Sequence, residues 1–262
     1  MRNLIIGDIH GCYDKLMKVL ENAKFSDTDF LTSVGDFCDR GDQNLKVLEF
    51  LISLPRFKAI RGNHDVWLYN YLYSIINDRR IDNESYFIWT DRNGGNKTVE
   101  ELRDLPIEKL NEIFSWLKKF PYILSDNKFI VLHGGPLNGM TESQILGQSG
   151  IKLEEGYDHT NWAEYNTTWY RNYTLSAITK ELIKRGQLDE EAVDYAFIDD
   201  PIETDKTIFV GHTPICNPMF KDLDTLPFIS EEYHLINVDT GSYKENGKIT
   251  VMDMDSRSFW QS

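Results

Sequence analysis

The stretch Ile5-Ile6-Gly7-Asp8-Ile9-His10-Gly11 decides the fold, because in it an apolar run ends in ligand-type side chains beside glycine. The pattern recurs in Val34-Gly35-Asp36, Ile60-Arg61-Gly62-Asn63-His64-Asp65, Val131-Leu132-His133-Gly134 and Phe209-Val210-Gly211-His212. Each apolar run is typical of a buried strand. Strands of one sheet that end in Asp, Asn and His would gather oxygen and nitrogen ligands at one edge. A two-metal hydrolytic centre needs such a ligand set.

The first sixty residues alternate between expected strands and helices. Apolar residues at helical spacing predict helices over 13–23 and 44–54, and Pro55 ends the second helix. Strands are predicted over 30–34 and 57–60. This βαβαβ order favours an α/β fold with neighbouring parallel strands.

The rest of the chain contains two long segments of mainly helical pattern, at about 66–125 and 136–205. Within the first segment, residues 89–95 are polar and glycine-containing, and a loop is expected there. Further strands are predicted over 129–132, 207–210, 235–238 and 248–252. No internal repeat or low-complexity linker divides the sequence, so residues 1–262 are predicted to form a single domain with two helical insertions.

Charge and hydropathy argue against several classes of partner. The formal net charge is -14, from 28 Lys and Arg against 42 Asp and Glu, and such a surface repels nucleic-acid phosphates. No apolar run is long enough to span a membrane, and the N-terminus leaves no room for a signal peptide. We therefore expect a cytoplasmic protein without nucleic-acid or membrane partners.

The three cysteines, Cys12, Cys38 and Cys216, are odd in number and widely spaced. A disulfide framework is not expected from this pattern, and a reducing compartment fits it. Cys12 and Cys38 lie near the expected ligands, which leaves a thiol ligand as an alternative. Small buried hydrophobic side chains are the favoured interpretation, because both lie off the positions where ligands recur.

The ligand segments predict two unequal metal sites. Asp8 and His10 alternate, so on a continuing strand both would face one side and hold one ion. Asp36 has two carboxylate oxygens and could bridge both ions. The protein ligands of the second ion would be completed by Asn63, His133 and His212. Mixed nitrogen and oxygen ligation favours Mn, with Fe or Zn as alternatives, over Mg or Ca.

Two ions roughly 3.5–4 Å apart can share and deprotonate a water and stabilise an in-line displacement, which phosphate ester hydrolysis requires. His64 is next to an expected ligand and is a candidate general acid. Asp39 could orient His64 or keep it protonated. Arg40 offers a planar fork of donors for a phosphate group.

Each of these residues also has an ordinary structural interpretation. An Asp-x-His sequence near a strand end is often a solvated turn, and Asp39-Arg40 could be a surface ion pair. His133 and His212 could be hydrogen-bonded core histidines. Their joint occurrence favours a site, because four of the six histidines fall on the ligand segments.

Three blocks, Gly7 to Gly11, Gly35 to Gly41 and Gly62 to Asp65, resemble the signature blocks of the calcineurin-like metallophosphoesterases. The Asp-Arg-Gly of the second block is similar to the phosphoprotein phosphatase branch. Within that branch the chain most resembles bacterial and bacteriophage lambda-type serine/threonine protein phosphatases. The resemblance implies a central β-sandwich of two mixed sheets flanked by helices, with a dinuclear metal centre at the strand ends.

The resemblance also implies roles for individual residues. Asp8, His10 and Asp36 would hold one divalent ion, and Asp36, Asn63, His133 and His212 would hold the other. His64 with Asp39 would form the acid pair, and Arg40, Asn63 and His64 would contact the substrate phosphate. Trp169-Tyr170-Arg171 resembles the context of a second phosphate-binding arginine, so Arg171 is its candidate. A helix-surface cation is the alternative for Arg171.

The family pattern implies a phosphomonoesterase that acts on phosphoserine or phosphothreonine in proteins, or on small phosphoesters, through direct attack of a metal-bridging hydroxide. Two departures bear on the substrate. Asp65 stands where lambda-type phosphatases usually carry Glu, and Asp also occurs there in symmetrical diadenosine tetraphosphatases. Gly134-Gly135 follows His133 where the family more usually has Ala. A dinucleoside polyphosphate hydrolase is the alternative, and a catalytically silent phosphate-binding module is disfavoured because every expected position is filled.

Overall fold

Two five-stranded β-sheets form the centre of the protein. The computed structural model describes residues 1–147, 167–215 and 225–262. The first sheet, ordered β10-β9-β1-β2-β3, contains β1 (Asn3–Ile6), β2 (Phe30–Ser33), β3 (Phe57–Ala59), β9 (Thr250–Asp253) and β10 (Phe259–Gln261). The second sheet, ordered β4-β5-β6-β8-β7, contains β4 (Ile123–Ser125), β5 (Phe129–Leu132), β6 (Thr207–Val210), β7 (Phe228–Ser230) and β8 (Leu235–Asn237).

Both sheets mix parallel and antiparallel neighbours. In the first sheet β1, β2 and β3 are parallel, whereas β9 runs antiparallel to both β1 and β10. In the second sheet β5, β6 and β8 are parallel, and β4 and β7 are antiparallel edge strands. Parallel strands end at the same edge of a sheet, so the loops after them lie together. The architecture of two mixed sheets flanked by helices, predicted from the resemblance, is confirmed.

The inner faces of the sheets pack on each other. Ile5 lies in β1, and Val34 and Ile60 directly follow β2 and β3. They join Phe209 and Ile236 of the second sheet in one apolar cluster. All five are at most 1% exposed. Burying a side chain of this size stabilises the folded protein by about 1.5–3 kcal/mol relative to leaving it in water, so this layer holds the two sheets together.

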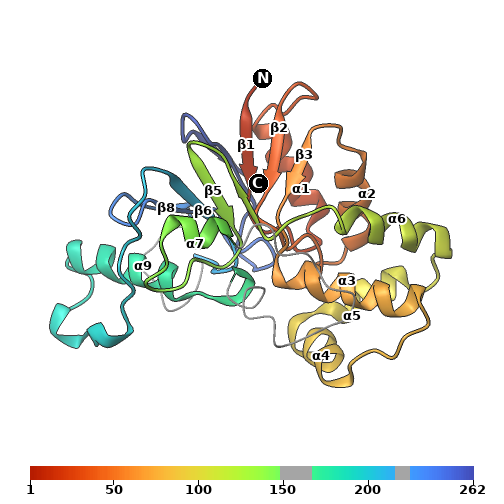
Figure 1. Ribbon diagram of the computed structural model, residues 1–262. Coiled ribbons are helices and arrows are strands. Elements are labelled where there is room, and N and C mark those ends of the chain that lie inside the picture. Colours follow the sequence, from red (N-terminus) through yellow and green to blue (C-terminus); the bar gives the residue numbers. More distant parts are fainter. Residues whose placement is uncertain (148–166, 216–224) are drawn as a thin grey trace.

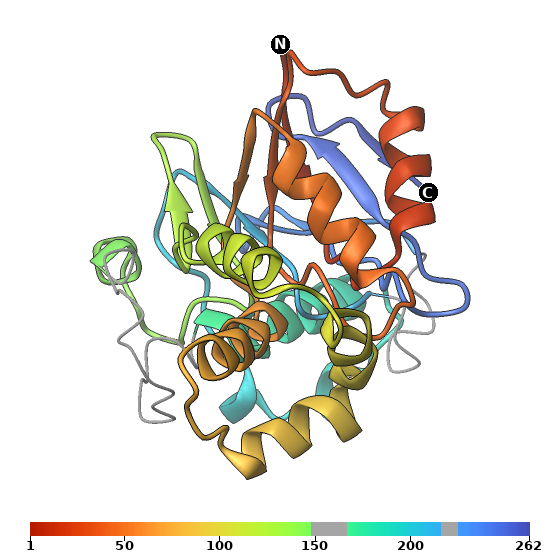
Figure 2. The same cartoon turned by 90° about the vertical axis from the view of Figure 1, so that its right-hand side faces the viewer.

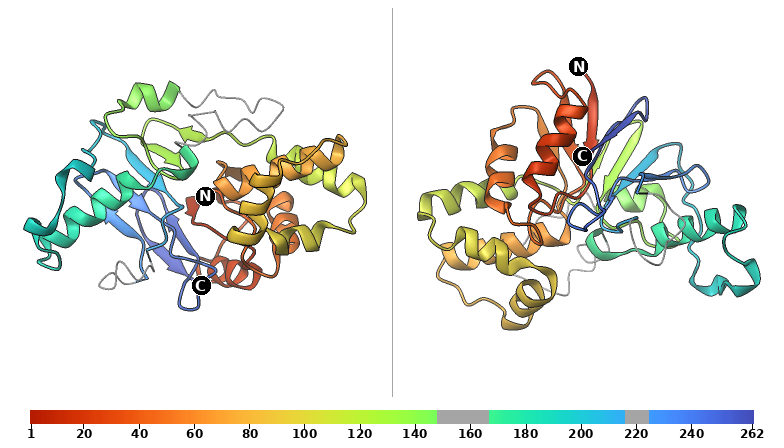
Figure 3. Two further views of the ribbon diagram at one scale, coloured as in Figure 1. Left: turned by 90° about the horizontal axis from the view of Figure 1, so that it is seen from below. Right: turned by 180° about the vertical axis from the view of Figure 1, so that it is seen from behind.

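Helices cover the outer faces (Figures 1 and 3). On the first sheet and its lower edge they are α1 (Tyr13–Asn22), α2 (Asn44–Ser53), α3 (Asn63–Ile76), α4 (Asn83–Phe87), a π-helix (Ile88–Arg92), α5 (Gly95–Leu102) and α6 (Ile107–Leu117). On the second sheet they are α7 (Glu142–Gly147) and α9 (Asn172–Lys184), followed by 3-10 turns at Glu190–Ala192 and Tyr195–Phe197. Their apolar faces contribute to two outer clusters. Leu16 belongs to the first cluster and Tyr173 to the second.

The predicted helices over 13–23 and 44–54 are observed as α1 and α2, and the predicted strands are also present. The prediction of a loop over 89–95 is wrong, because a π-helix covers Ile88–Arg92 and α5 begins at Gly95. Packing decides this segment. Trp89 is 1% exposed, and a Cβ on Gly95 would lie 2.3 Å from its indole nitrogen.

Among the described residues, no helix has both the length and the apolar character that a membrane span requires. Cys216 lies outside the described residues. The organisation of residues 1–262 as one domain stays a prediction.

Candidate dimetal active site

The predicted ligands all follow the ends of parallel strands, in a loop or at the start of a helix. They are Asp8 and His10 after β1, Asp36 after β2, Asn63 at the start of α3, His133 after β5 and His212 after β6. All six side chains are buried. The sheet edges bring distant positions together: the Asp8 carboxylate accepts the backbone N–H of His212 at 3.1 Å. The arrangement gathers ligand-type atoms from both sheets at one place.

The backbone of this site is held in rarely populated conformations. The φ angle is 48° at His10, 54° at Asp36, 75° at Asp39, 66° at Arg40 and 63° at His212. Non-glycine residues seldom adopt this left-handed region, and such strain concentrates at functional sites. The prediction that Asp8 and His10 alternate along a strand is wrong, because β1 ends at Ile6. A turn, not a pleat, directs His10 toward Asp36.

Two glycines let the loops approach the carboxylates closely. A Cβ on Gly62 would lie 2.0 Å from Asp36 Oδ1, and one on Gly211 would lie 2.2 Å from Asp8 Oδ1. Any other residue at either position would collide with a ligand. These contacts explain the glycines at positions 62 and 211.

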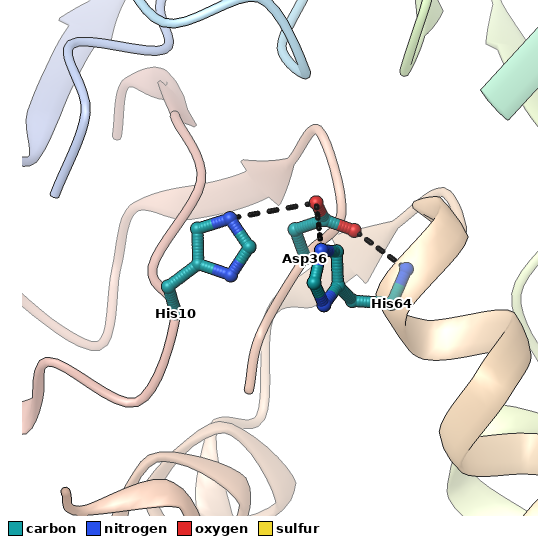
Figure 4. A group of neighbouring side chains, drawn as sticks. All are labelled: His10, Asp36 and His64. Carbon is teal, nitrogen blue, oxygen red and sulfur yellow. Dashed lines mark hydrogen bonds and ion pairs between the residues drawn. The ribbon is translucent and has the colours of Figure 1, made fainter. Parts of the chain in front are cut away.

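Asp36 lies at the centre of the site (Figure 4). Its Oδ2 is 3.6 Å from His10 Nε2 and 3.3 Å from His133 Nε2. Its Oδ1 accepts the backbone N–H of His64 at 3.0 Å. Ligand atoms of His10, Asp36 and His64 lie within 4.8 Å of one another, as do those of Asp36, His133 and His212. Two groups that share one carboxylate fit a pair of cations.

Three histidines each use one ring nitrogen to hold a backbone carbonyl. His10 Nδ1 donates to Cys38 at 3.0 Å, His133 Nδ1 to Val34 at 2.7 Å, and His212 Nε2 to Trp169 at 3.2 Å. Each of these bonds places a proton on the bonded nitrogen, so the other nitrogen of the ring can offer its lone pair to a cation when the ring is neutral. Metal-ligating histidines have this arrangement, so the three rings fit a metal centre better than an ordinary core.

The charge of the site also fits divalent cations. Burial and the Asp239 carboxylate raise the pKa of Asp8 well above its ordinary value. Burial raises the pKa of Asp36, but the neighbouring histidines, first of all His133, outweigh it and hold that pKa well below its usual range. Burial lowers the pKa of His133, yet Asp36 outweighs it and raises the pKa to about 9. Buried carboxylates that lie this close together repel one another, and bound cations stabilise their charged form.

The predicted acid pair is fully buried beside Asp36. His64 Nδ1 lies 2.6 Å from Asp39 Oδ2. The same carboxylate accepts the indole N–H of Trp89 at 2.6 Å and the hydroxyl of Thr98. His64 Nε2 lies 4.0 Å from Asp36 Oδ2 and has no hydrogen-bond partner among the described residues. That nitrogen is therefore available to a substrate oxygen.

Both predicted phosphate-binding arginines lie at this centre. Arg40 Nη1 is 3.0 Å from His10 Nε2, and its guanidinium carbon is 4.3 Å from the ring centroid of Tyr243. Arg171 Nη1 donates to the His212 carbonyl at 2.7 Å. A surface ion pair at Asp39-Arg40 and a helix-surface cation at Arg171 do not fit these positions.

Asp65 joins the loops that carry the ligands. Its carboxylate accepts the backbone N–H groups of Asp36, Phe37 and Gly62 at 2.7, 3.0 and 2.8 Å. Burial and the nearby Asp36 raise the pKa of Asp65 to about 7. The side chain thus ties the loop after β2 to the first turn of α3, and it positions two ligand segments rather than facing the substrate.

Sequence reasoning missed Trp89 and Thr98 as partners of Asp39, because they lie 50 and 59 residues away along the chain. No local motif marks them. Cys38 is fully buried, and burial and Asp39 raise the pKa of its thiol well above its ordinary value. Among the described residues the candidate cation groups contain no cysteine, which favours the small-hydrophobe interpretation.

The sequence signature of the family described as calcineurin-like phosphoesterase matches residues 1–234. The chain belongs to this family. Its members are dimetal-dependent phosphoesterases, and the metal identity is not fixed by the match. The resemblance read from the three sequence blocks is therefore confirmed at the level of the family.

Similar curated proteins are symmetrical bis(5'-nucleosyl)-tetraphosphatases. The protein of this name from Vibrio vulnificus (strain YJ016) is 33% identical over 137 residues, which is 52% of this chain and 45% of that protein. Its namesake from Buchnera aphidicola subsp. Acyrthosiphon pisum (strain 5A) is 30% identical over 176 residues, 66% of this chain and 58% of that protein. The chain spans about half the length of the curated relatives it matches.

Solved structures share the fold across several named activities. A putative diadenosine tetraphosphatase superposes with a TM-score of 0.57 at 17% identity and covers 100% of this chain and 92% of that one. A protein serine/threonine phosphatase from Saccharomyces cerevisiae superposes with a TM-score of 0.56 at 14% identity and covers 100% and 79%. At these identities the likeness supports the fold and does not separate substrates.

Proposed function

We propose that this calcineurin-like phosphoesterase hydrolyses dinucleoside tetraphosphates symmetrically to two nucleoside diphosphates. The observation that carries the proposal is its similarity to proteins of that name, at 33% and 30% identity. Asp65, which departs from the lambda-type protein phosphatase pattern, supports the same choice. The alternative drawn from the sequence thus takes precedence over the protein phosphatase hypothesis.

In this proposal Asp8, His10 and Asp36 hold one divalent cation: His10 and Asp36 lie in one candidate cation group, and Asp8 Oδ2 is 4.0 Å from His10 Nε2. The second is held by Asp36, Asn63, His133 and His212. When bound, the two cations supply the charge that acidifies a water and neutralises the phosphoryl oxygens. Mixed nitrogen and oxygen donors favour Mn, with Fe or Zn as alternatives. The residues around these ligands supply the remaining parts of the reaction.

Symmetrical hydrolysis breaks the bond between a bridging oxygen and one central phosphorus. The oxygen of water joins that phosphorus, and the other nucleoside diphosphate leaves and needs a proton. His64 Nε2 donates that proton, since Nδ1 is held by Asp39 and Nε2 has no partner among the described residues. Arg40 and Arg171 bind phosphoryl oxygens, because guanidinium groups match their geometry.

Phosphoserine and phosphothreonine in proteins are the competing substrates. The fold likeness to a serine/threonine phosphatase and the Asp-Arg-Gly block keep this function as second candidate. Both reactions need the same metal ligands, so the ligands cannot distinguish them. A catalytically silent module is less well supported, because the ligand and acid positions are all filled.

The test uses the purified full chain loaded with Mn. Diadenosine tetraphosphate and a phosphothreonine peptide are compared by kcat/KM, and the nucleotide products are separated by chromatography. We expect a higher kcat/KM for the dinucleotide and ADP as its only nucleotide product. Preferential cleavage of the peptide, or release of AMP with ATP, would overturn the proposal. The Asp36→Asn variant controls for contaminating phosphatases.

A further inference from the structure

A cavity of about 680 Å³ opens between α3, α4 and the π-helix. This volume falls within the range of pockets that bind small molecules and cofactors. Five aromatic side chains line it together with Arg79 and Arg80: Trp67, Tyr71, Tyr73, Tyr86 and Trp89. We call this cavity the α3–α4 pocket. In Figures 1 and 2 these helices lie on the side of the molecule to which the carboxyl ends of β1 to β3 point.

The α3–α4 pocket shares a wall with the acid pair. The ring of Trp67 meets the ring of His64 edge to face, with 5.2 Å between their centroids. On its other side Trp67 packs against Trp169, whose carbonyl holds His212. Trp89 lines the pocket and donates its indole N–H to Asp39. Trp67 and Trp89 therefore form the wall between the pocket and the acid pair.

The lining aromatics suit a nucleobase. Tyr71, Tyr86 and Trp89 form one cluster: centroids lie 5.4 Å apart for Tyr71 and Trp89 and 6.1 Å apart for Tyr71 and Tyr86. Tyr86 is only partly buried, so it keeps a ring surface at the pocket. Aromatic faces stack on bases of any sequence, and alanine substitution at such contacts costs about 1–3 kcal/mol per base.

Two cationic side chains and one carboxylate line the α3–α4 pocket: Arg79, Arg80 and Asp82, whose Oδ2 accepts the backbone N–H of Ser85. Arg79 and Arg80 are adjacent and exposed, and neither guanidinium forms an ion pair with a described residue. The chain as a whole has a formal net charge of -14. Two unpaired guanidiniums beside aromatic rings offer forked donors to phosphate next to a stacked base.

The geometry points to the α3–α4 pocket as a binding site for one nucleoside end of the dinucleotide, with the base against Tyr86 and the adjoining phosphate at Arg79 and Arg80. This inference rests on the proposed function. It assigns the substrate preference to α3 and α4, whereas the metal ligands catalyse the step common to all phosphoesters. A small aryl phosphate carries no nucleoside, so it does not use the pocket.

The test uses the full, metal-loaded chain with the double variant R79A/R80A and the variant Tyr86→Ala. The double variant K118A/K119A is the matched control, because these neighbouring lysines are exposed at the end of α6 and do not line the pocket. Three quantities are measured: kcat and KM for diadenosine tetraphosphate, kcat/KM for p-nitrophenyl phosphate, and the Kd for ADP by calorimetry.

We expect R79A/R80A to raise the KM for the dinucleotide and the Kd for ADP by about tenfold or more, the effect of losing a charged hydrogen bond. Tyr86→Ala should raise both by roughly 5- to 100-fold, as for a lost stacking contact. Hydrolysis of p-nitrophenyl phosphate should not change, which also shows that the variants are folded. K118A/K119A should behave as the unmodified protein.

The outcomes separate this inference from the proposed function. If the dinucleotide is cleaved equally well by R79A/R80A and K118A/K119A, the pocket inference is overturned and the proposed function stands. If the unmodified protein cleaves only aryl phosphates, but R79A/R80A still weakens ADP binding, the proposed function fails and the nucleotide pocket stands. If ADP binding is the same in all variants, the pocket inference is overturned regardless of which phosphoester is cleaved.

Discussion

The strand-end loops and the α3–α4 pocket lie on opposite sides of two tryptophans, Trp67 and Trp89, but they are built differently. The loops are buried, strained and rich in carboxylates, and each ligand histidine is fixed by a backbone carbonyl. The pocket is open to solvent at its rim, aromatic and locally cationic. Such a division places a rigid reaction centre beside a surface that can vary without disturbing it.

The difference teaches where function is determined in this molecule. We expect the residues of the proposed reaction centre to tolerate little change, because Gly62 and Gly211 meet the Asp36 and Asp8 carboxylates at contacts that admit only glycine. The lining of the α3–α4 pocket has no comparable constraint on Arg79, Arg80 or Tyr86. We therefore expect substitutions in the first region to abolish all activities, and substitutions in the second to change only the choice of substrate.

The largest effect is expected for Asp36→Asn. The variant loses the carboxylate shared by both candidate cation groups, so activity on every phosphoester should fall to background. Metal analysis after dialysis should show that at least one cation is lost. Asp126→Asn, an exposed position, is the control. If the Asp36→Asn protein keeps both cations and its turnover, Asp36 is not the shared ligand.

The next effect is expected for His64→Asn. Loss of the general acid should lower kcat by ~10²–10⁴-fold for both aryl phosphate and dinucleotide, with bound metal retained. His234→Asn, an exposed histidine, serves as the comparison. Near-normal turnover would remove His64 from the mechanism. Loss of metal would instead make it a ligand, which its place in the group with His10 and Asp36 allows.

A smaller effect on activity is expected for Trp89→Phe. Trp89 belongs to both regions, because it lines the pocket and donates its indole N–H to Asp39. Phenylalanine keeps an aromatic ring but removes the N–H that Asp39 accepts at 2.6 Å. Removing such an outer partner typically lowers activity by 10–100-fold, so kcat for p-nitrophenyl phosphate should fall by about tenfold with metal content unchanged. Trp260→Phe is the matched substitution away from the site. Equal kcat in both variants would mean that the indole hydrogen bond does not position Asp39.

The smallest effect is expected at Asp29, far from both regions. Its carboxylate accepts donors from Arg2, which hold the pKa at about 2, below its usual 3.8. A carboxyl with a lowered pKa in the folded state stabilises the protein above about pH 4, and this is lost as pH falls toward 2. The contribution is on the order of 1–2 kcal/mol, because the Arg2 guanidinium is partly exposed.

Urea unfolding of the unmodified protein and Asp29→Asn at about pH 6 and about pH 3 checks this expectation. The difference in the free energy of unfolding should narrow at the lower pH. Activity on both aryl phosphate and dinucleotide should stay unchanged. A difference that does not depend on pH would show that the Arg2–Asp29 ion pair does not contribute through its charge.

The sequence predicted the parts of the site that are encoded locally. Asp8, Asp36 and His133 each follow an apolar run and stand beside glycine, and these short patterns need no knowledge of distant residues. The backbone that presents them was not predictable: His10 was expected on a strand and lies in a left-handed turn. Its conformation depends on the loop after β2, whose Cys38 carbonyl holds the ring.

The sequence alone therefore determined the family, because its three motif blocks resemble the family signature, and the two-sheet architecture and reaction class followed from that resemblance. Only the tertiary structure determined which residues surround the acid pair and which residues line the α3–α4 pocket. Trp89 was assigned to a loop, yet it is buried against Asp39. Contacts between α3, α4 and the π-helix set that position, and no local pattern in the chain records them.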